Sequence, residues 1–296
     1  MAWLTLQIGL EGLDPDAAEV ACLDAGAVSV TLTDAADDAI LEPAPGELRL
    51  WPHTTLQALF SADAASPALL AQLAATLGID VTRIRTHALE DRPWEREWLK
   101  DYHAMQFGPR LWVAPGHEVA AVAQAHPAAV VLELDPGLAF GTGTHPTTAL
   151  CLQWLEQHLA PGSTLIDYGC GSGILAIAAL KLGAGAAACF DIDPQALIAT
   201  RDNAATNDCT DRLRLIEEDA GLPPGVDLVL ANIISGTLCD LAPRFAQLVR
   251  PGGDLVMAGL LCEQAPLVTA ACSAWFDTLP FGTRGEWTAL VAKRRA

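Results

Sequence analysis

The chain has 296 residues, 51% hydrophobic and 18% charged, which is enough for two domains and a large core. Its formal net charge of −19 at pH 7 argues against a nucleic-acid partner, because binding to phosphate requires a basic face. The 8 cysteines show neither a C-x-x-C spacing nor a zinc-type Cys/His cluster, and no secretory or membrane-spanning segment is evident, so we expect a cytoplasmic protein without a metal centre.

Residues 1–90 combine strand and helix patterns in the manner of a small α+β unit. A helix is expected after the capping residue Asp14, and a second helix over residues 67–77. The order β-α-β-β-α-β is that of a ferredoxin-like domain. Its four strands are predicted at residues 4–10, 28–32, 47–52 and 81–88.

The charge of this first segment suggests a kind of partner. Residues 1–90 carry 3 basic and 13 acidic side chains, a difference of −10. Such a surface attracts a basic partner by electrostatic steering, although an acidic surface also serves solubility alone.

Residues 91–130 are expected to bridge two domains. Trp94, Trp98 and Tyr102 recur every four residues, which predicts an aromatic stripe along a helix. Packing of that stripe against a neighbouring domain is the favoured interpretation.

Residues 131–296 alternate short apolar strands with helices, which predicts a mostly parallel, doubly wound α/β sheet with its ligand beyond the carboxyl ends of the strands. The predicted strands are 130–134, 164–168, 187–191, 213–217, 227–232, 254–258, 276–281 and 286–292, and the predicted helices are 144–159, 173–182, 194–207 and 237–249.

The motif Asp-Tyr-Gly-Cys-Gly-Ser-Gly at residues 167–173 follows one of these strands and opens a helix. Gly169, Gly171 and Gly173 let the chain turn tightly and bring backbone N–H groups against a ligand. The helix N-terminus behind them favours a negative group, such as the carboxylate of a methionine-type ligand. Asp167, which opens the motif, is included in the candidate site.

Two further acidic residues follow the next strands. Asp191 stands 20 residues after Gly171, where a carboxylate accepts hydrogen bonds from both hydroxyls of a ribose. Asp219 follows the third strand and is a candidate acceptor for an adenine amino group, although an acidic residue in a surface loop gives the same pattern.

The segment Gly-Ser-Gly-Ile-Leu-Ala at residues 171–176 also satisfies the looser dinucleotide pattern G-x-G-x-x-A, so the glycines alone do not exclude a nicotinamide cofactor. Asp167, Gly169 and an Asn at the end of the fourth strand favour S-adenosylmethionine instead. That residue, Asn232, is expected to point toward the reactive part of the ligand, and its alternative role is to cap the next helix.

Residues 135–148 form a Gly/Thr-rich stretch that is too polar for a core and too apolar for a solvated linker. It predicts an ordered loop that closes over a cofactor and enters a helix capped by Thr144, with Pro146 in its first turn. His145 is either a base or a loop histidine with a structural hydrogen bond. The loop residues expected at the cofactor are Phe140, Gly141 and Thr142.

Over its whole length, the chain resembles the PrmA family, the methyltransferases that modify ribosomal protein L11. The resemblance implies a ferredoxin-like domain at 1–90 that recognises the substrate, a linker at 91–130, and a Rossmann-like class I methyltransferase domain at 131–296. Its most specific segments are residues 91–98, 135–148, 166–183 and 191–203.

The resemblance also implies S-adenosylmethionine as the cofactor and the lysine and N-terminal amines of ribosomal protein L11 as acceptors. After the fourth strand the family has Asn-Ile-Leu-Ala, whereas this chain has Asn-Ile-Ile-Ser at residues 232–235. The family's cofactor contacts fall on Thr148, Gly169, Asp191 and Asn232, and we add Gly171, Gly173, Phe140, Gly141, Thr142, Asp167 and Asp219.

The expected reaction is displacement of a methyl group from a sulfonium by a neutral amine, which the protein assists by positioning and by a dry site. An oxygen of Asn232 is the candidate group for orienting the amine. The alternatives are a methyltransferase for RNA or a small molecule, a nicotinamide-dependent oxidoreductase, and a non-catalytic binding module. The lack of a long exposed apolar stripe favours a monomer.

Overall fold

The computed structural model describes residues 3–35, 51–64, 66–89, 102–134, 141 and 143–296. By its internal contacts the chain divides into two compact units, Met1–Trp94 and Glu95–Ala296. Across the described ranges, no helix is long and apolar enough to cross a membrane.

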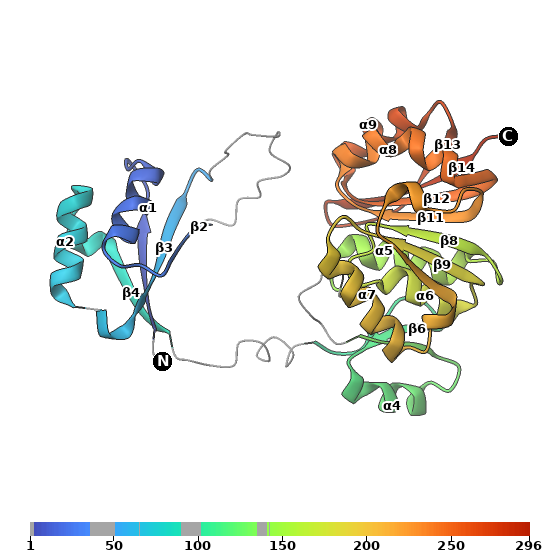
Figure 1. Ribbon diagram of the computed structural model, residues 1–296, viewed down its shortest axis with the longest axis horizontal. Helices are drawn as coiled ribbons and strands as arrows, with labels where there is room; N and C mark the ends of the chain where they lie inside the picture. Colours follow the sequence, from blue (N-terminus) through green and yellow to red (C-terminus); the bar gives the residue numbers. More distant parts are fainter. Residues whose placement is uncertain (1–2, 36–50, 65, 90–101, 135–140, 142) are drawn as a thin grey trace. The chain divides into compact units, whose positions relative to one another are not determined.

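The first unit is a four-stranded antiparallel sheet with both helices on one face (Figure 1). The sheet order β2-β3-β1-β4 together with the chain order confirms the ferredoxin-like prediction. Leu6 and Ile8 of the first strand pack with Leu73 of the second helix, between the sheet and the helices. The elements are β1 (Trp3–Gly9), α1 (Pro15–Asp24), β2 (Ser29–Asp34), β3 (Thr54–Ser61), α2 (Pro67–Leu77) and β4 (Ile84–Leu89).

The third strand of this unit differs from the prediction. The strand predicted at 47–52 is wrong where the structure describes it, because Trp51 and Pro52 lie before the strand, and the rest of that range lies outside the described residues. Buried and half-buried side chains instead alternate along all of β3. The alternation is difficult to recognise in the sequence because Thr54 and Ala58 occupy two of the inward positions.

Local signals set the helix boundaries of the first unit. The Asp14 carboxylate accepts the N–H groups of Asp16 and Ala17, as an N-cap should. The helix α2 has the predicted bounds and ends at Gly78, whose φ of 65° suits glycine. Asp80 caps a 3-10 turn, so β4 begins later than the predicted residue 81.

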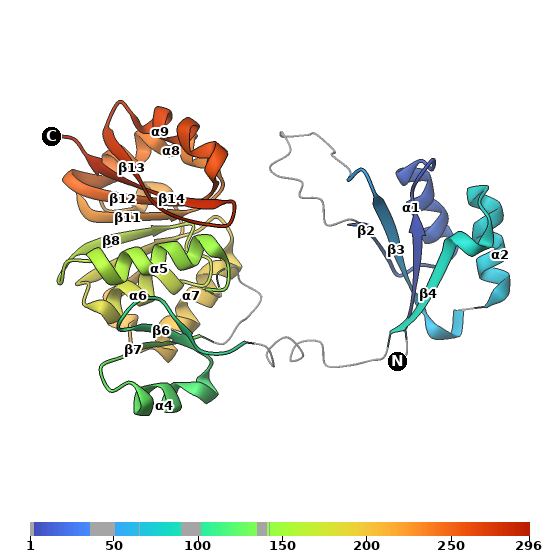
Figure 2. The same cartoon turned by 180° about the vertical axis from the view of Figure 1, so that it is seen from behind.

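The second unit is built on a seven-stranded sheet with the order β10-β9-β8-β11-β12-β14-β13 (Figures 1 and 2). The first five strands run parallel, and β14 lies antiparallel between β12 and β13. The predicted doubly wound α/β sheet is confirmed. Its strands are β8 (Thr164–Tyr168), β9 (Ala186–Phe190), β10 (Leu213–Ile216), β11 (Val226–Asn232), β12 (Val249–Leu261), β13 (Phe276–Arg284) and β14 (Trp287–Arg294).

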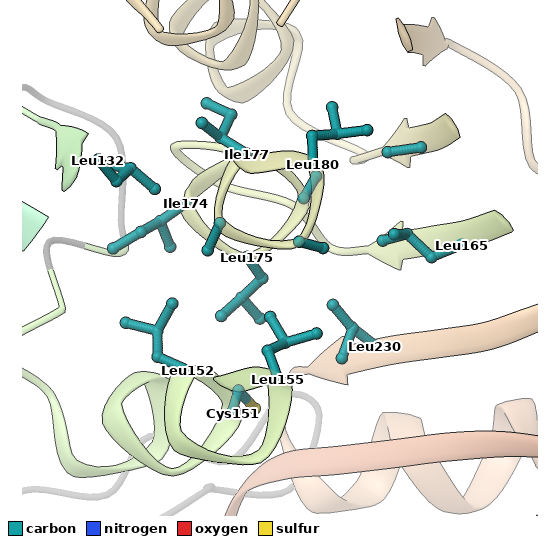
Figure 3. Packing of buried hydrophobic residues seen from close by; sticks show 14 of the residues in the cluster. Leu132, Cys151, Leu152, Leu155, Leu165, Ile174, Leu175, Ile177, Leu180 and Leu230 are labelled. Atoms are coloured by element: carbon teal, nitrogen blue, oxygen red, sulfur yellow. The ribbon is translucent and has the colours of Figure 1, made fainter. Parts of the chain in front are cut away.

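Helices cover both faces of this sheet. One buried cluster joins α5, α6 and α7 to the sheet, and a second joins α8 and α9 to the opposite face. Leu152 and Leu155 of α5 lie against Leu175 of α6 over the strands (Figure 3). The helices are α5 (Pro146–His158), α6 (Ile174–Leu182), α7 (Pro194–Thr206), α8 (Ser235–Leu248) and α9 (Ala265–Cys272).

A separate three-stranded sheet, ordered β5-β6-β7, belongs to the same unit. Leu132 of β7 packs beside Ile174 of α6 (Figure 3), so part of the predicted bridge is integral to the second unit. The helix predicted around Trp94 and Trp98 lies outside the described residues, whereas Tyr102 is buried. The elements are β5 (Met105–Gln106), β6 (Leu111–Ala114), α4 (Gly116–Ala125) and β7 (Val130–Glu133).

Candidate active site

The glycine motif forms a tight loop between β8 and α6. Gly169 and Gly173 have φ values of 75° and 77°, which L side chains rarely adopt. A Cβ at Gly169 would overlap Ile233, and one at Gly173 would lie 2.7 Å from Thr200 Cγ2. The Gly169 N–H donates to the Phe190 carbonyl oxygen at 2.8 Å, which anchors the loop to the end of β9. The loop therefore needs glycine both for its conformation and for the space around it.

Asp191 lies at the carboxyl end of β9 and is joined to this loop. Its Oδ2 accepts the Gly171 N–H at 2.9 Å, and its Oδ1 accepts the Asp193 N–H at 3.0 Å. Each carboxylate oxygen has more than one acceptor site, so these bonds orient the group and leave it able to bind hydroxyls. The structure thus brings two of the predicted site residues into direct contact.

Thr148 and Asn232 form a second pair, although 84 positions separate them in the sequence. The Asn232 side-chain Nδ2 donates to Thr148 Oγ1 at 3.2 Å. Thr148 is completely buried in the first turn of α5, so it is a firm support for the half-buried Asn232. The bond fixes the plane of the amide, whose Oδ1 is an acceptor for a ligand.

Asp167 is the penultimate residue of β8, just before the glycine loop, and its environment is unusual. Its side chain is 1% exposed, and Oδ2 accepts the Ala176 N–H at 3.0 Å. Oδ1 is buried and has no hydrogen-bond partner within the described part of the chain. Burial raises the pKa of this carboxyl to about 7, with a smaller upward contribution from Asp191, against the lowering effect of the Ala176 bond. An orphaned acceptor at this position fits a ligand that carries a positive charge.

Asp219 lies in a short turn after β10, and its side chain is already engaged. Tyr168 donates its hydroxyl to Oδ1 at 3.0 Å, and Arg244 Nε donates to Oδ2 at 2.8 Å. Burial, assisted by Asp219, raises the pKa of Tyr168 to about 12. The role of Asp219 toward an adenine amino group stays a prediction, and any such bond has to use the lone pairs that remain.

The Gly/Thr-rich segment reaches the site at Gly141, whose carbonyl oxygen accepts the Ser172 hydroxyl at 2.6 Å. Phe140 and Thr142 lie outside the described residues. The contact places Gly141, in the middle of the segment, against the glycine loop.

The helix that follows begins differently from the prediction. His145, not Thr144, is the N-cap of α5, because its Nδ1 accepts the Thr147 N–H and Pro146 takes the first helical position. Nδ1 also pairs with the Thr147 hydroxyl at 2.7 Å, and the ring meets Trp287 edge-on at 4.7 Å. Burial lowers the pKa of His145. These contacts favour the structural interpretation of His145 over a role as a base.

Several residues near the site were not found from the sequence. Tyr168 and Ser172 lie inside the glycine motif, but nothing in the motif distinguishes them, and Arg244 is an isolated cation on a helix. Ile192 follows Asp191 and is 91% exposed, which is unusual for so large an apolar side chain. It borders a cavity of about 340 Å³ whose other walls are Asp191, Pro194, Leu197, Ile198, Arg201 and Glu217.

A slightly larger cavity, of about 400 Å³, lies at the opposite edge of the sheet. Ion pairs between Arg250 and Asp227 and between Lys293 and Asp254 line it, so its charged groups are already paired. Among the described residues, no group of three His, Cys, Asp or Glu is arranged to hold a metal ion. The candidate site is therefore the carboxyl edge of β8, β9 and β11.

Comparisons with known proteins identify the family to which this fold and this sequence are similar. The family model for ribosomal protein L11 methyltransferase (PrmA) matches residues 2–295. A ribosomal protein L11 methyltransferase from Pseudomonas aeruginosa (strain LESB58) is 48% identical over 297 residues, and one from Azotobacter vinelandii is 47% identical over 296 residues, with 100% of each chain covered. The crystal structure of a ribosomal protein L11 methylase from Lactobacillus delbrueckii subsp. bulgaricus is 31% identical, has a TM-score of 0.60, and covers 66% of this chain and 100% of its own.

Proposed function

Because the chain belongs to the ribosomal protein L11 methyltransferase (PrmA) family, we propose that it transfers methyl groups from S-adenosylmethionine to lysine and N-terminal amines of ribosomal protein L11. The observation that carries the proposal is the contact of Asp191 with the glycine loop at the carboxyl edge of a doubly wound sheet. The Asn232–Thr148 pair stands on the other side of β8, at the end of β11.

The residues of this edge suit the parts of S-adenosylmethionine. The N–H groups of the glycine loop and the start of α6 would hold its carboxylate, and Asp191 would hold the ribose hydroxyls. Asp167 would face positive charge, because its buried Oδ1 is an acceptor without a partner in the described structure. Asp219 and the exposed Ile192 would border the base. When bound, the cofactor supplies a methyl group attached to a positively charged sulfonium sulfur. The sulfur leaves readily because it departs as a neutral thioether.

The chain's own part in the reaction is positioning. The acceptor nitrogen must be neutral when its lone pair forms the new bond to the methyl carbon, as the carbon–sulfur electron pair returns to sulfur. An unperturbed lysine has a pKa of about 10.4, and removal from water lowers the pKa of an amine. Asn232 Oδ1, held by the bond to Thr148, would orient the amine. The proton leaves to solvent, and a methylated amine can then react again.

The two units divide the work in this proposal. The residues assigned to the cofactor all belong to the second unit, Glu95–Ala296, so residues 1–90 are free to recognise the protein substrate. Their 3 basic and 13 acidic side chains suit a basic partner and disfavour RNA. We expect a cytoplasmic monomer. Deleting residues 1–90 should keep cofactor binding and abolish methylation of the protein, and full activity of the truncated chain would contradict this division.

The proposal is tested by transfer of labelled methyl from S-adenosylmethionine. Three acceptors are offered separately: ribosomal protein L11, total large-subunit RNA, and a mixture of small amines. Label in the protein alone, lost in Asp191→Ala, supports the proposal. Label in RNA would support S-adenosylmethionine as the cofactor but would refute ribosomal protein L11 as the substrate. No label, with no cofactor binding, would overturn both.

A further inference from the structure

Arg244 of α8 holds the turn at Asp219 with two of its nitrogen atoms. Nε donates to the Asp219 carboxylate at 2.8 Å, and Nη2 donates to the Asp219 backbone carbonyl at 2.7 Å. A guanidinium presents these donors in one rigid plane, which fixes both the side chain and the backbone of its partner. A lysine has no such pair of donors in a fixed geometry.

Tyr168 completes this arrangement from the other side. Its hydroxyl donates to Asp219 Oδ1 at 3.0 Å. Its ring packs against the rings of Phe190 and Phe245, with centroid separations of 4.9 Å and 5.3 Å. Tyr168 is the last residue of β8 and directly precedes Gly169. One hydrogen bond, from Tyr168, thus ties the turn after β10 to the strand that opens the glycine loop, although β9 lies between these two strands, and the two Arg244 bonds tie the same turn to α8.

The Arg244–Asp219 ion pair is only partly exposed to solvent, which strengthens its hydrogen bonds. The Arg244 side chain is 24% exposed and that of Asp219 is 38% exposed, so the ion pair is partly shielded from water. Charge-assisted bonds in such a place are stronger than bonds between neutral groups. A second ion pair of similar length, Arg250 to Asp227 at 2.7 Å, lies at the amino ends of β11 and β12 and offers a matched control.

We propose that Arg244 and Tyr168 are positioning residues for the nucleobase end of the cofactor site. They set the place of the Asp219 turn relative to the glycine loop, and so determine cofactor affinity and base selectivity rather than the rate of methyl transfer. A carboxylate is an acceptor only, so the turn favours a base with an exocyclic amino group over one with a carbonyl oxygen. This inference rests on the proposed function, since it takes S-adenosylmethionine as the ligand.

The test is calorimetric titration of the full-length protein with S-adenosylhomocysteine and with its inosine analogue. The variants are Arg244→Gln, Arg244→Lys and Tyr168→Phe, and Arg250→Gln is the control. We expect Arg244→Gln to raise the Kd of S-adenosylhomocysteine at least about tenfold, as for loss of charged hydrogen bonds, and to reduce the preference for adenine. Arg244→Lys should recover only part of the affinity. Tyr168→Phe keeps the ring packing and should cost about three- to tenfold.

Kinetics separate positioning from general damage. At saturating S-adenosylmethionine, kcat of Arg244→Gln should stay within about twofold of wild type, because the interaction lies away from the reacting atoms. The inference is overturned if Arg244→Gln binds as wild type does, if its kcat falls at unchanged Kd, or if Arg250→Gln loses as much affinity. Absence of binding by the wild-type protein would instead refute the proposed function.

Discussion

The free energy of unfolding of Asp167→Asn is expected to increase relative to that of wild type as the pH rises. The carboxyl is 1% exposed, and its Oδ1 has no hydrogen-bond partner in the described structure. Burial raises its pKa from 3.8 to about 7, and proximity to Asp191 adds to the rise. A charged form that is disfavoured by burial costs folding energy wherever the pH would ionise it.

The sign and the size follow from proton binding. Between pH 4 and pH 7 the folded state holds a proton on Asp167 that the unfolded state has released, so stability falls as the pH rises through this window. Each unit of pH costs up to about 1.36 kcal/mol, and the loss is complete above the folded-state pKa. An amide does not ionise, so the free energy of unfolding of the variant minus that of wild type should increase by roughly 3 kcal/mol from pH 5 to pH 8.

Denaturant unfolding of both proteins at pH 5, 6, 7 and 8 measures this difference. Asp227→Asn is the control: bonds from Thr164 and Arg250 lower the pKa of Asp227, so it is charged throughout the window and its loss should destabilise equally at each pH. The same Asp167→Asn protein should bind S-adenosylhomocysteine at least about tenfold more weakly. A difference from wild type that does not change with pH would refute the argument.

Two further substitutions test other parts of the site, and a thiol titration tests the burial of the cysteines. Gly169→Ala should abolish cofactor binding, because a Cβ there would overlap Ile233 at a positive φ, and calorimetry would show it. Thr148→Val removes the acceptor for the Asn232 amide and should lower kcat about five- to tenfold in the methyl-transfer assay. In a thiol-reagent titration of the native protein, the exposed Cys262 should react first, since six of the eight cysteines are buried.

The doubly wound sheet was predictable because its boundaries carry local signals. β8 has the predicted bounds, since an apolar run ends at the glycine motif that must follow it. The helix α7 has a side-chain cap and Pro in its first turn, as has α2 of the first unit. Where such signals exist, sequence spacing also places the strand ends that carry Asp191 and Asn232.

Some elements with weaker signals were missed, although α6 and α8 were predicted without a side-chain cap. The helices α4 and α9 have no side-chain cap hydrogen bond, and β5 has only two residues, so its pairing with β6 decides its conformation. The inward face of β3 includes small and polar residues, so its alternating pattern is hard to recognise in the sequence. In each case the tertiary partner, rather than the local pattern, determines the structure.

The site itself shows a similar limit. Asp191 was found because a fixed spacing from the glycine motif reflects the fold, whereas Arg244 meets Asp219 only through the packing of α8 on the sheet. A positioning residue needs no particular spacing from the motif it serves. Its identification therefore depends on the three-dimensional contacts.

Asp167 shows how local cost and function are connected. A strand that ends in the core ordinarily has an apolar or fully paired residue there, and a buried carboxyl with only one of its oxygens hydrogen-bonded in the described structure departs from that rule. Asparagine at position 167 would remove the charge with little change in volume, so stability alone does not explain why the chain has an aspartate there. We propose that a ligand that brings positive charge explains it, because such a ligand would supply in the complex the partner that Oδ1 lacks in the described structure. The expected opposite effects of Asp167→Asn, greater stability at alkaline pH and weaker binding of the cofactor, follow from that single carboxyl group.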